Sequence, residues 1–182
     1  MLTGGYNRRG FIHNSENIFR HCADRTDYAV LYFNVRNFKA VNELFGIDTG
    51  DSVLSTIYKN LRSSSLKPCV VARVEADQFT CLVEKKNLDF DALSGLCEWN
   101  FTKKGKTMHI FCGCGIFFVE NKEMSINGMI DRAKLAKKYI TDEYVKPYNI
   151  YDASMKSYYI DRAELAGELR NGLAQEQFKV YY

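Results

Sequence analysis

The sequence predicts an α+β fold in which helices flank a central, mostly antiparallel sheet. Two observations lead to this class. Apolar runs typical of strands alternate with segments whose apolar residues recur at helical spacing, and two β-prone runs within residues 70–84 are separated only by a short acidic connection. With 182 residues, the chain is long enough for one well-buried domain and an appendage.

Four elements are predicted before this hairpin. Apolar residues at helical spacing indicate helices over residues 8–23, 38–45 and 51–61, and the apolar run within residues 27–35 indicates a central strand. Gly46 directly follows the second helix and is its expected C-cap, because glycine tolerates the left-handed backbone that ends many helices.

Four further elements are predicted after the hairpin. Residues 88–101 and 125–140 show helical spacing, and Ser125 is placed to cap the second of these helices. Residues 107–119 form another strand-like run, and residues 148–151 are expected to close an edge of the sheet.

Composition excludes several classes of function. A net charge of +3 is too small to indicate a nucleic-acid partner, and no basic run is interleaved with aromatic residues. This fragment has no apolar stretch of transmembrane length and no signal segment, so we expect a cytoplasmic protein. The six cysteines lack metal-ligand spacing, which favours buried, reduced thiols.

The connection inside the predicted hairpin carries the most specific motif of the chain. A tight hairpin usually has Gly or Asn at its turn, whereas this connection has two carboxylates and an alanine. The stretch resembles the signature hairpin of diguanylate cyclases, Arg-x-Gly-Gly-Asp/Glu-Glu-Phe, in a degenerate form. The residues that match this signature are Arg73, Asp77 and Phe79, and those that depart from it are Glu75, Ala76 and Gln78.

Other segments resemble the same family in its order and at its spacing. Residues 2–9 resemble its opening Leu-Thr-Gly-Leu-x-Asn-Arg-Arg, and residues 33–42 resemble its Asp-x-Asp-x-Phe-Lys-x-x-Asn. Residues 45–54 and 130–138 resemble its Gly-His-x-x-Gly-Asp-x-x-Leu and Ala-Asp-x-Ala-x-x-x-Ala-Lys motifs. The resemblance implies that residues 1–155 form a GGDEF domain with the ferredoxin-like palm of nucleotide cyclases.

The end of the chain carries a second resemblance. An amphipathic helix is predicted over residues 159–174 and a strand over residues 178–182. The run from Leu169 to the last residue resembles the entry into an EAL domain, the cyclic di-GMP phosphodiesterase partner of GGDEF domains. We therefore expect residues 156–182 to be a linker helix and the first strand of a truncated EAL domain; the alternative is that they complete the first domain.

The resemblance implies a catalytic site that has lost its metal ligands. The family joins two GTP molecules with the help of divalent ions, usually Mg²⁺, which prefer carboxylate oxygens. The first acidic position is Asn34 here, and Arg36 stands where a second aspartate is common. Asp77 remains as a vestigial ligand, while Glu75 adds negative charge near the expected triphosphate. We expect no catalytic residues and no cyclase activity.

The guanine pocket implied by the resemblance is better preserved. Asn42 and Asp51 match the two residues that recognise the base. Lys138 matches the phosphate-binding lysine of the family, and Lys39 matches a phosphate-binding or structural position. The arginine that follows the second lysine by four residues in the family is Asp142 here. The alternative is that Asp51 is an acid in the first turn of a helix, favoured by the helix dipole, and that Asn42 is an ordinary polar residue.

Arg36 also admits a structural role. In the family fold the first strand lies beside the signature hairpin, so we hypothesise that Arg36 pairs with Glu75 or Asp77. Such a pair would put a protein charge in the place of the missing metal.

Three functions follow from these residues. The favoured one is a regulatory domain that controls an attached EAL phosphodiesterase and binds GTP. The alternatives are a cyclase with residual activity and a structural dimerisation module without a ligand. We expect no firmly held cofactor, Mg²⁺ only together with bound GTP, and GTP, the EAL domain and a second copy of the chain as candidate partners.

Overall fold

The computed structural model describes residues 3–103, 105–120, 123–142, 144–159, 171 and 175. The chain divides into two units, Met1–Tyr151 and Asp152–Tyr182. In the second unit residues 153–159 are helical. The strand predicted over residues 178–182 and most of the helix predicted before it lie outside the described residues, so the EAL assignment stays a prediction.

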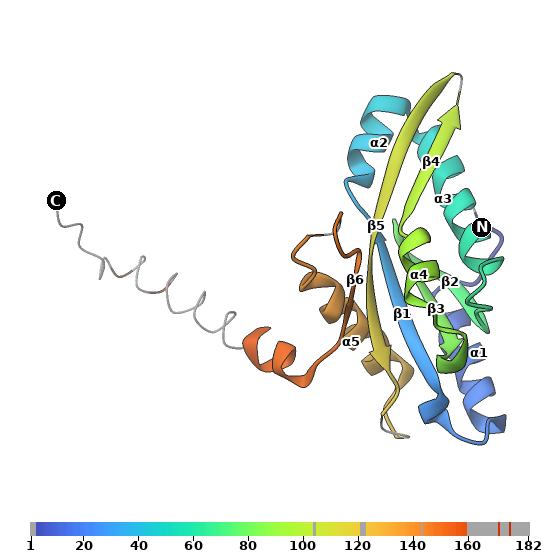
Figure 1. Ribbon diagram of the computed structural model, residues 1–182, viewed down its shortest axis with the longest axis vertical. Helices are drawn as coiled ribbons and strands as arrows, with labels where there is room; N and C mark the ends of the chain where they lie inside the picture. The colour runs from blue at the N-terminus through green and yellow to red at the C-terminus, as the bar shows by residue number, and fades with distance from the viewer. Residues whose placement is uncertain are drawn as a thin grey trace. The chain divides into compact units, whose positions relative to one another are not determined.

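The first unit is a six-stranded sheet with helices on both faces, which confirms the predicted α+β class (Figure 1). The strand order is β2-β3-β1-β5-β4, all neighbours in this order are antiparallel, and β6 pairs in parallel with β5. The strands are β1 Tyr28–Val35, β2 Val70–Glu75, β3 Gln78–Glu84, β4 Glu98–Lys103, β5 Lys106–Phe118 and β6 Tyr148–Ile150. The helices are α1 Arg8–His21, α2 Phe38–Phe45, α3 Ile47–Arg62, α4 Phe90–Gly95 and α5 Ile126–Lys138, with short 3-10 turns at Arg25–Asp27 and Lys85–Asn87.

Side chains on alternate faces of β1 enter two separate cores. One face contributes Leu31 and Phe33 to a core that includes the buried residues of α3 and α4. The other face contributes Val30 and Tyr32 to a core that includes the buried residues of α1 and α5. Because successive strand residues point to opposite faces, Asn34 lies on the α1–α5 side of the sheet.

Helix α5 packs unusually close to the sheet. A Cβ atom added to Gly115 on β5 would overlap the backbone carbonyl oxygen of Ala133 and crowd the backbone nitrogen of Lys137. A glycine is therefore required at this contact, and the contact fixes the height at which the end of α5 stands above β1 and β5.

The segment before α1 lies along β2. Tyr6 forms a parallel bridge with Ala72, and the backbone N–H of Arg73 donates to the carbonyl of Tyr6 at 3.0 Å. Asn7 then caps α1 by accepting a hydrogen bond from the backbone of Gly10.

Two predicted helices differ from the structure. The predicted helix over residues 88–101 is wrong beyond its middle: α4 ends at Gly95, and Trp99 and Phe101 lie in β4, which pairs with β5. Helix α3 begins at Ile47, four residues before the predicted start, so Asp51 is its fifth residue and not a first-turn acid. The caps predicted at Gly46 and Ser125 are confirmed. Within the described ranges, no helix has the length and apolar character needed to cross a bilayer.

Candidate nucleotide-binding site

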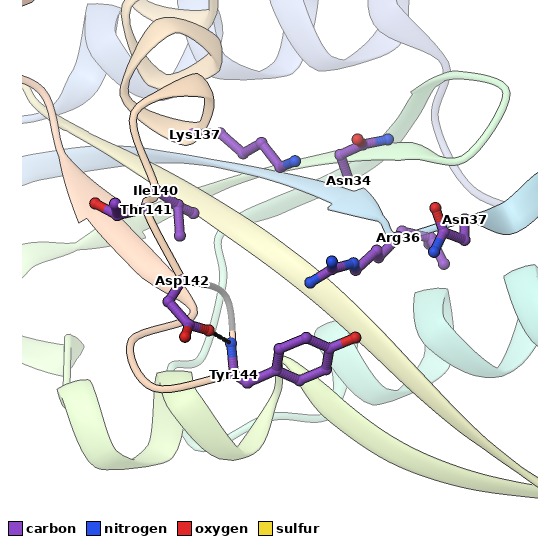
Figure 2. A pocket seen from close by; sticks show the side chains of 9 residues that line it. Asn34, Arg36, Asn37, Lys137, Ile140, Thr141, Asp142 and Tyr144 are labelled. Carbon is purple, nitrogen blue, oxygen red and sulfur yellow. Dashed lines mark hydrogen bonds between the residues drawn. The ribbon is translucent and has the colours of Figure 1, made fainter.

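A cleft of about 590 Å³ opens where β1 ends, between the start of α2 and the end of α5. Its lining combines two cationic side chains, one carboxylate and several neutral polar groups (Figure 2). The lining residues are Asn34, Val35, Arg36, Asn37, Lys137, Ile140, Thr141, Asp142 and Tyr144.

The end of β1 is tied to the turn of the β2–β3 hairpin. The side-chain amide of Asn34 donates to a carboxylate oxygen of Asp77 at 2.9 Å, and the backbone N–H of Val35 donates to the carbonyl of Asp77 at 3.2 Å. The structure thus brings together the two positions that the resemblance predicts as metal ligands, and joins them directly by a hydrogen bond.

Asp77 sits in surroundings that disfavour its charge. The residue is half-buried, and desolvation raises the pKa of its carboxyl above the ordinary 3.8. The hydrogen bond from Asn34 and the positive charges of Lys137 and Arg73 oppose this rise without cancelling it. A carboxylate held between two cations would show the opposite shift, so Asp77 is only weakly compensated.

The side chain of Arg36 lies against an aromatic ring. Its guanidinium is 4.5 Å from the centre of the Tyr144 ring, and this ring in turn meets Phe111 edge-on, with centres 4.8 Å apart. The backbone N–H of Arg36 donates to the carbonyl of Phe111 at 2.8 Å. Asp77 accepts its hydrogen bond from Asn34, and the Arg36 guanidinium lies over the Tyr144 ring; the pairing of Arg36 with Glu75 or Asp77 stays a prediction.

Asp142 organises the loop that forms one wall of the cleft. Its carboxylate accepts hydrogen bonds from the backbone N–H groups of Tyr144 at 2.8 Å and Val145 at 3.3 Å (Figure 2). The residue that replaces an arginine of the family signature thus stabilises the turn that places Tyr144 beside Arg36.

The lysine in the cleft is Lys137. Its side chain extends from the end of α5 toward Asn34 (Figure 2), and its charge reaches Asp77. Lys138, which sequence comparison selected, is exposed and follows the lining residue. Helical periodicity explains why Lys137 lines the cleft. Lys137 lies four residues after the buried Ala133 and therefore on the side of α5 that meets the sheet. Lys39 is highly exposed, and its side-chain Nζ lies 3.5 Å from the carboxylate Oε1 of Glu43 on α2.

A pair of divalent metal ions does not fit these residues. Mg²⁺ needs several oxygen ligands, usually including carboxylates, at short range in octahedral geometry. Asn34 turns its amide N–H₂ to Asp77 and so occupies one of the carboxylate oxygens, while Lys137 and Arg36 bring positive charge to the same cleft. In the described ranges, no three Asp, Glu, His or Cys side chains gather as a metal site would need.

The hairpin turn keeps a glycine-like backbone after losing its glycines. Ala76 has φ +35°, in the left-handed region that glycine adopts without steric cost. The Arg73 guanidinium donates to the carbonyl of Ala76 and closes the turn. Glu75 is exposed, Gln78 pairs in register with Asn34, and the signature Phe79 is fully buried.

The residues proposed for base recognition meet at the α2–α3 corner. Asn42 on α2 lies so close to Gly50 on α3 that an added Cβ at Gly50 would overlap the Asn42 amide oxygen. Asp51 follows Gly50 directly, and both Asn42 and Asp51 are half-buried. Gly46, with φ +84°, joins the two helices, which brings the predicted pair to one corner.

Known proteins resemble the chain over most of the first unit. The profile described as "Diguanylate cyclase, GGDEF domain" matches residues 1–139. Diguanylate cyclase DgcM of Escherichia coli (strain K12) is 35% identical over 89 residues, which are 48% of this chain and 22% of DgcM. The bifunctional diguanylate cyclase/cyclic di-GMP phosphodiesterase MucR of Pseudomonas aeruginosa is 23% identical over 164 residues, 87% of this chain and 24% of MucR.

The chain spans about a quarter of the length of these curated relatives. Among solved structures, the GGDEF domain of TpbB (YfiN) from Pseudomonas aeruginosa superposes with a TM-score of 0.66 at 20% identity. That likeness covers 87% of this chain and 96% of the other, and it shows a shared fold. Because the profile matches more than half of the residues, the chain belongs to the diguanylate cyclase GGDEF-domain family.

Proposed function

We propose that this GGDEF domain makes no cyclic di-GMP and instead serves cyclic di-GMP signalling as a regulatory domain that binds GTP. The observation that carries the proposal is the hydrogen bond of 2.9 Å between Asn34 and Asp77. It joins the two positions that would have to hold metal, and one of them is a neutral amide. Without metal ions to activate the attacking hydroxyl and neutralise the phosphates, phosphoryl transfer has no driving group here.

The α2–α3 corner supports the binding half of the proposal. Asn42 offers an amide and Asp51 a carboxylate, which are complementary to the donors and acceptors on the edge of guanine. Gly50, which precedes Asp51, lets the Asn42 side chain approach α3 closely.

The regulated partner that we propose is an attached EAL phosphodiesterase. The motif at the end of the chain supports this, and so does the similarity to MucR, whose name includes both cyclase and phosphodiesterase activities. In this arrangement GTP binding to the present domain would change the phosphodiesterase rate of the longer protein.

Two assays test the proposal. The chain is incubated with GTP and either Mg²⁺ or Mn²⁺, and cyclic di-GMP is measured by chromatography; we expect none above a blank without protein. Calorimetry then measures GTP binding, which Asn42→Ala should weaken by about tenfold or more because a hydrogen-bonded site loses its partner for the base.

Asn60→Ala on α3 serves as the matched control, because it makes the same chemical change away from the corner. Product formation that Asp77→Asn abolishes would overturn the loss of catalysis. Equal GTP binding by wild type and Asn42→Ala would overturn the guanine pocket.

A further inference from the structure

Two cationic side chains enter the cleft beside Asn34 and Asp77, near the position that metal ions take in the family. Building on the proposed nucleotide binding, we propose that the cleft holds the polyphosphate of a nucleotide directly through Arg36 and Lys137, without any divalent ion. The ligand class is therefore a metal-free nucleoside triphosphate, and the protein supplies the positive charge itself.

The two cations come from different elements and converge on one space. Arg36 lies directly after β1, and Lys137 lies in the last turn of α5, so the cleft is bounded on two sides by positive charge (Figure 2). Its volume of about 590 Å³ is within the range of small-ligand sites. Neutral polar groups of Asn37 and Thr141 also line the cleft, and the one carboxylate of the lining, Asp142, accepts hydrogen bonds from the backbone N–H groups of Tyr144 and Val145.

The position of Arg36 suits an anion contact. The guanidinium carbon lies over the Tyr144 ring, 4.5 Å from its centre, and the hydrogen bond to Phe111 fixes the backbone of the same residue. A guanidinium is a planar group whose N–H donors match phosphate oxygens in pairs, which an ammonium does not offer.

The start of α2 adds partial positive charge to the same cleft. Asn37 lines the cleft and is the N-cap of α2, with φ +50° and no hydrogen bond from its side chain to the first turn. The first N–H groups of a helix carry a partial positive charge and bind anions readily. This end of α2 therefore opens toward the cleft that Arg36 and Lys137 border.

A divalent ion should oppose this binding. Mg²⁺ on the triphosphate removes negative charge from the ligand and adds positive charge beside Arg36 and Lys137, and both effects weaken the attraction. The direction of the metal effect thus distinguishes this site from one in which metal ions bridge protein and phosphate.

The test compares two ligands, GTP and inorganic tripolyphosphate, by calorimetry in excess EDTA and in saturating Mg²⁺. We expect both ligands to bind more tightly in EDTA. Lys137→Met should weaken both by about tenfold, the loss of one charge-assisted hydrogen bond. Lys59→Met is the matched control, because it makes the same change at an exposed lysine of α3 that does not line the cleft. Arg36→Gln is a second variant, and a thermal melt of each variant checks that it folds.

Each outcome separates this inference from the proposed function. GTP binding that requires Mg²⁺ overturns the inference and leaves nucleotide binding intact. Tripolyphosphate binding in EDTA that Lys137→Met weakens, together with GTP binding insensitive to Asn42→Ala, supports the inference and overturns the guanine pocket. Equal losses in Lys137→Met and Lys59→Met overturn the site, and the absence of binding by either ligand in both conditions overturns both proposals.

Discussion

The cleft at the end of β1 and the α2–α3 corner lie in consecutive parts of one chain, yet they differ in how far they follow the family signature. In the cleft, Asn34 and Arg36 replace acids, and the hairpin turn has lost its glycines. At the corner, Asn42 and Asp51 both match the residues of the signature. The proposed function rests on this difference: the cleft departs from the signature at the positions for metal and phosphate, and the corner keeps the residues that match those for the base.

The proposed function treats binding and catalysis as separable in this fold. A metal site fails when one carboxylate becomes an amide, because a divalent ion needs charge from its ligands. A base is held by hydrogen bonds and packing, which the corner supplies from two helices independently of the hairpin. The two regions also differ in the atoms that pack against their glycines. Gly115 beside the cleft contacts backbone atoms of α5, whereas Gly50 at the corner contacts side-chain atoms of α2.

Gly115→Ala, which changes the contact between β5 and α5 beside the cleft, should produce the largest change in the free energy of unfolding. Its new methyl group meets the backbone of Ala133 and Lys137, which cannot rotate away, so α5 must move off β5. We expect a loss of about 3 kcal/mol in the free energy of unfolding, the upper range for an overpacked core. Urea unfolding followed by circular dichroism measures this loss.

Gly50→Ala is the matched change at the corner. Here the new methyl group meets the end of the Asn42 side chain, which can turn aside, so the loss should be about 1 kcal/mol or less. Comparable losses in the two variants would contradict the distinction between a backbone-fixed cleft and a side-chain-fixed corner.

Asp77→Asn should have a smaller effect of opposite sign. The raised pKa of Asp77 means that the folded state binds more protons than the unfolded state just above the ordinary value of 3.8. The free energy of unfolding therefore falls as pH rises from 3.8 through the raised pKa of Asp77. At neutral pH the stabilising contribution of the protonated carboxyl is lost. The asparagine variant should be more stable than wild type at pH 7, and the gain should vanish below pH 3.8.

Urea unfolding across a pH series measures this gain. Asp91→Asn, at an exposed aspartate of α4, should give no comparable gain. A wild-type protein that becomes more stable as pH rises from 3.8 to 7, relative to Asp77→Asn, would mean that Asp77 is paired with a cation after all.

Ala76→Gly should have the smallest effect. An alanine at φ +35° carries a steric cost of about 1–2 kcal/mol, and glycine removes it while losing about 0.5–1 kcal/mol in chain entropy. A net gain of about 0.5 kcal/mol in unfolding free energy is expected from thermal melts. Ala40→Gly inside α2 should instead cost about 1 kcal/mol, and a loss in both variants would show that Ala76 is unstrained.

Local patterns predicted much of this fold. The β2–β3 hairpin, β1, α2 and α5 agree with their predicted ranges within a few residues, because periodicity and caps are properties of neighbouring residues. Strand β4 escaped prediction because Trp99 and Phe101 satisfy either a helical or an alternating pattern over a short run. Their pairing with β5 decided the outcome, and such pairing is not visible in a local window.

The candidate site was predicted in its positions but not in its contacts. The sequence identified Asn34 and Asp77 as the former metal pair, yet their hydrogen bond joins residues 43 positions apart and depends on the register of two strands. Motif spacing predicted Lys138 as a phosphate-binding residue and gave no signal for Lys137, which the structure places in the lining of the cleft. Tyr144 entered no motif, because its role depends on the turn that Asp142 stabilises.

The bridge between Tyr6 and Ala72 has a consequence for solubility. In the order β2-β3-β1-β5-β4, β2 is an outermost strand, and outer strands expose backbone groups that can pair with other chains and begin aggregation. The carbonyl of Tyr6 accepts a hydrogen bond from the backbone N–H of Arg73 at 3.0 Å. One of the backbone groups on the outer edge of β2 is therefore already paired. The few residues before α1 thereby shield the margin of the sheet, and shortening the chain past Tyr6 would uncover it.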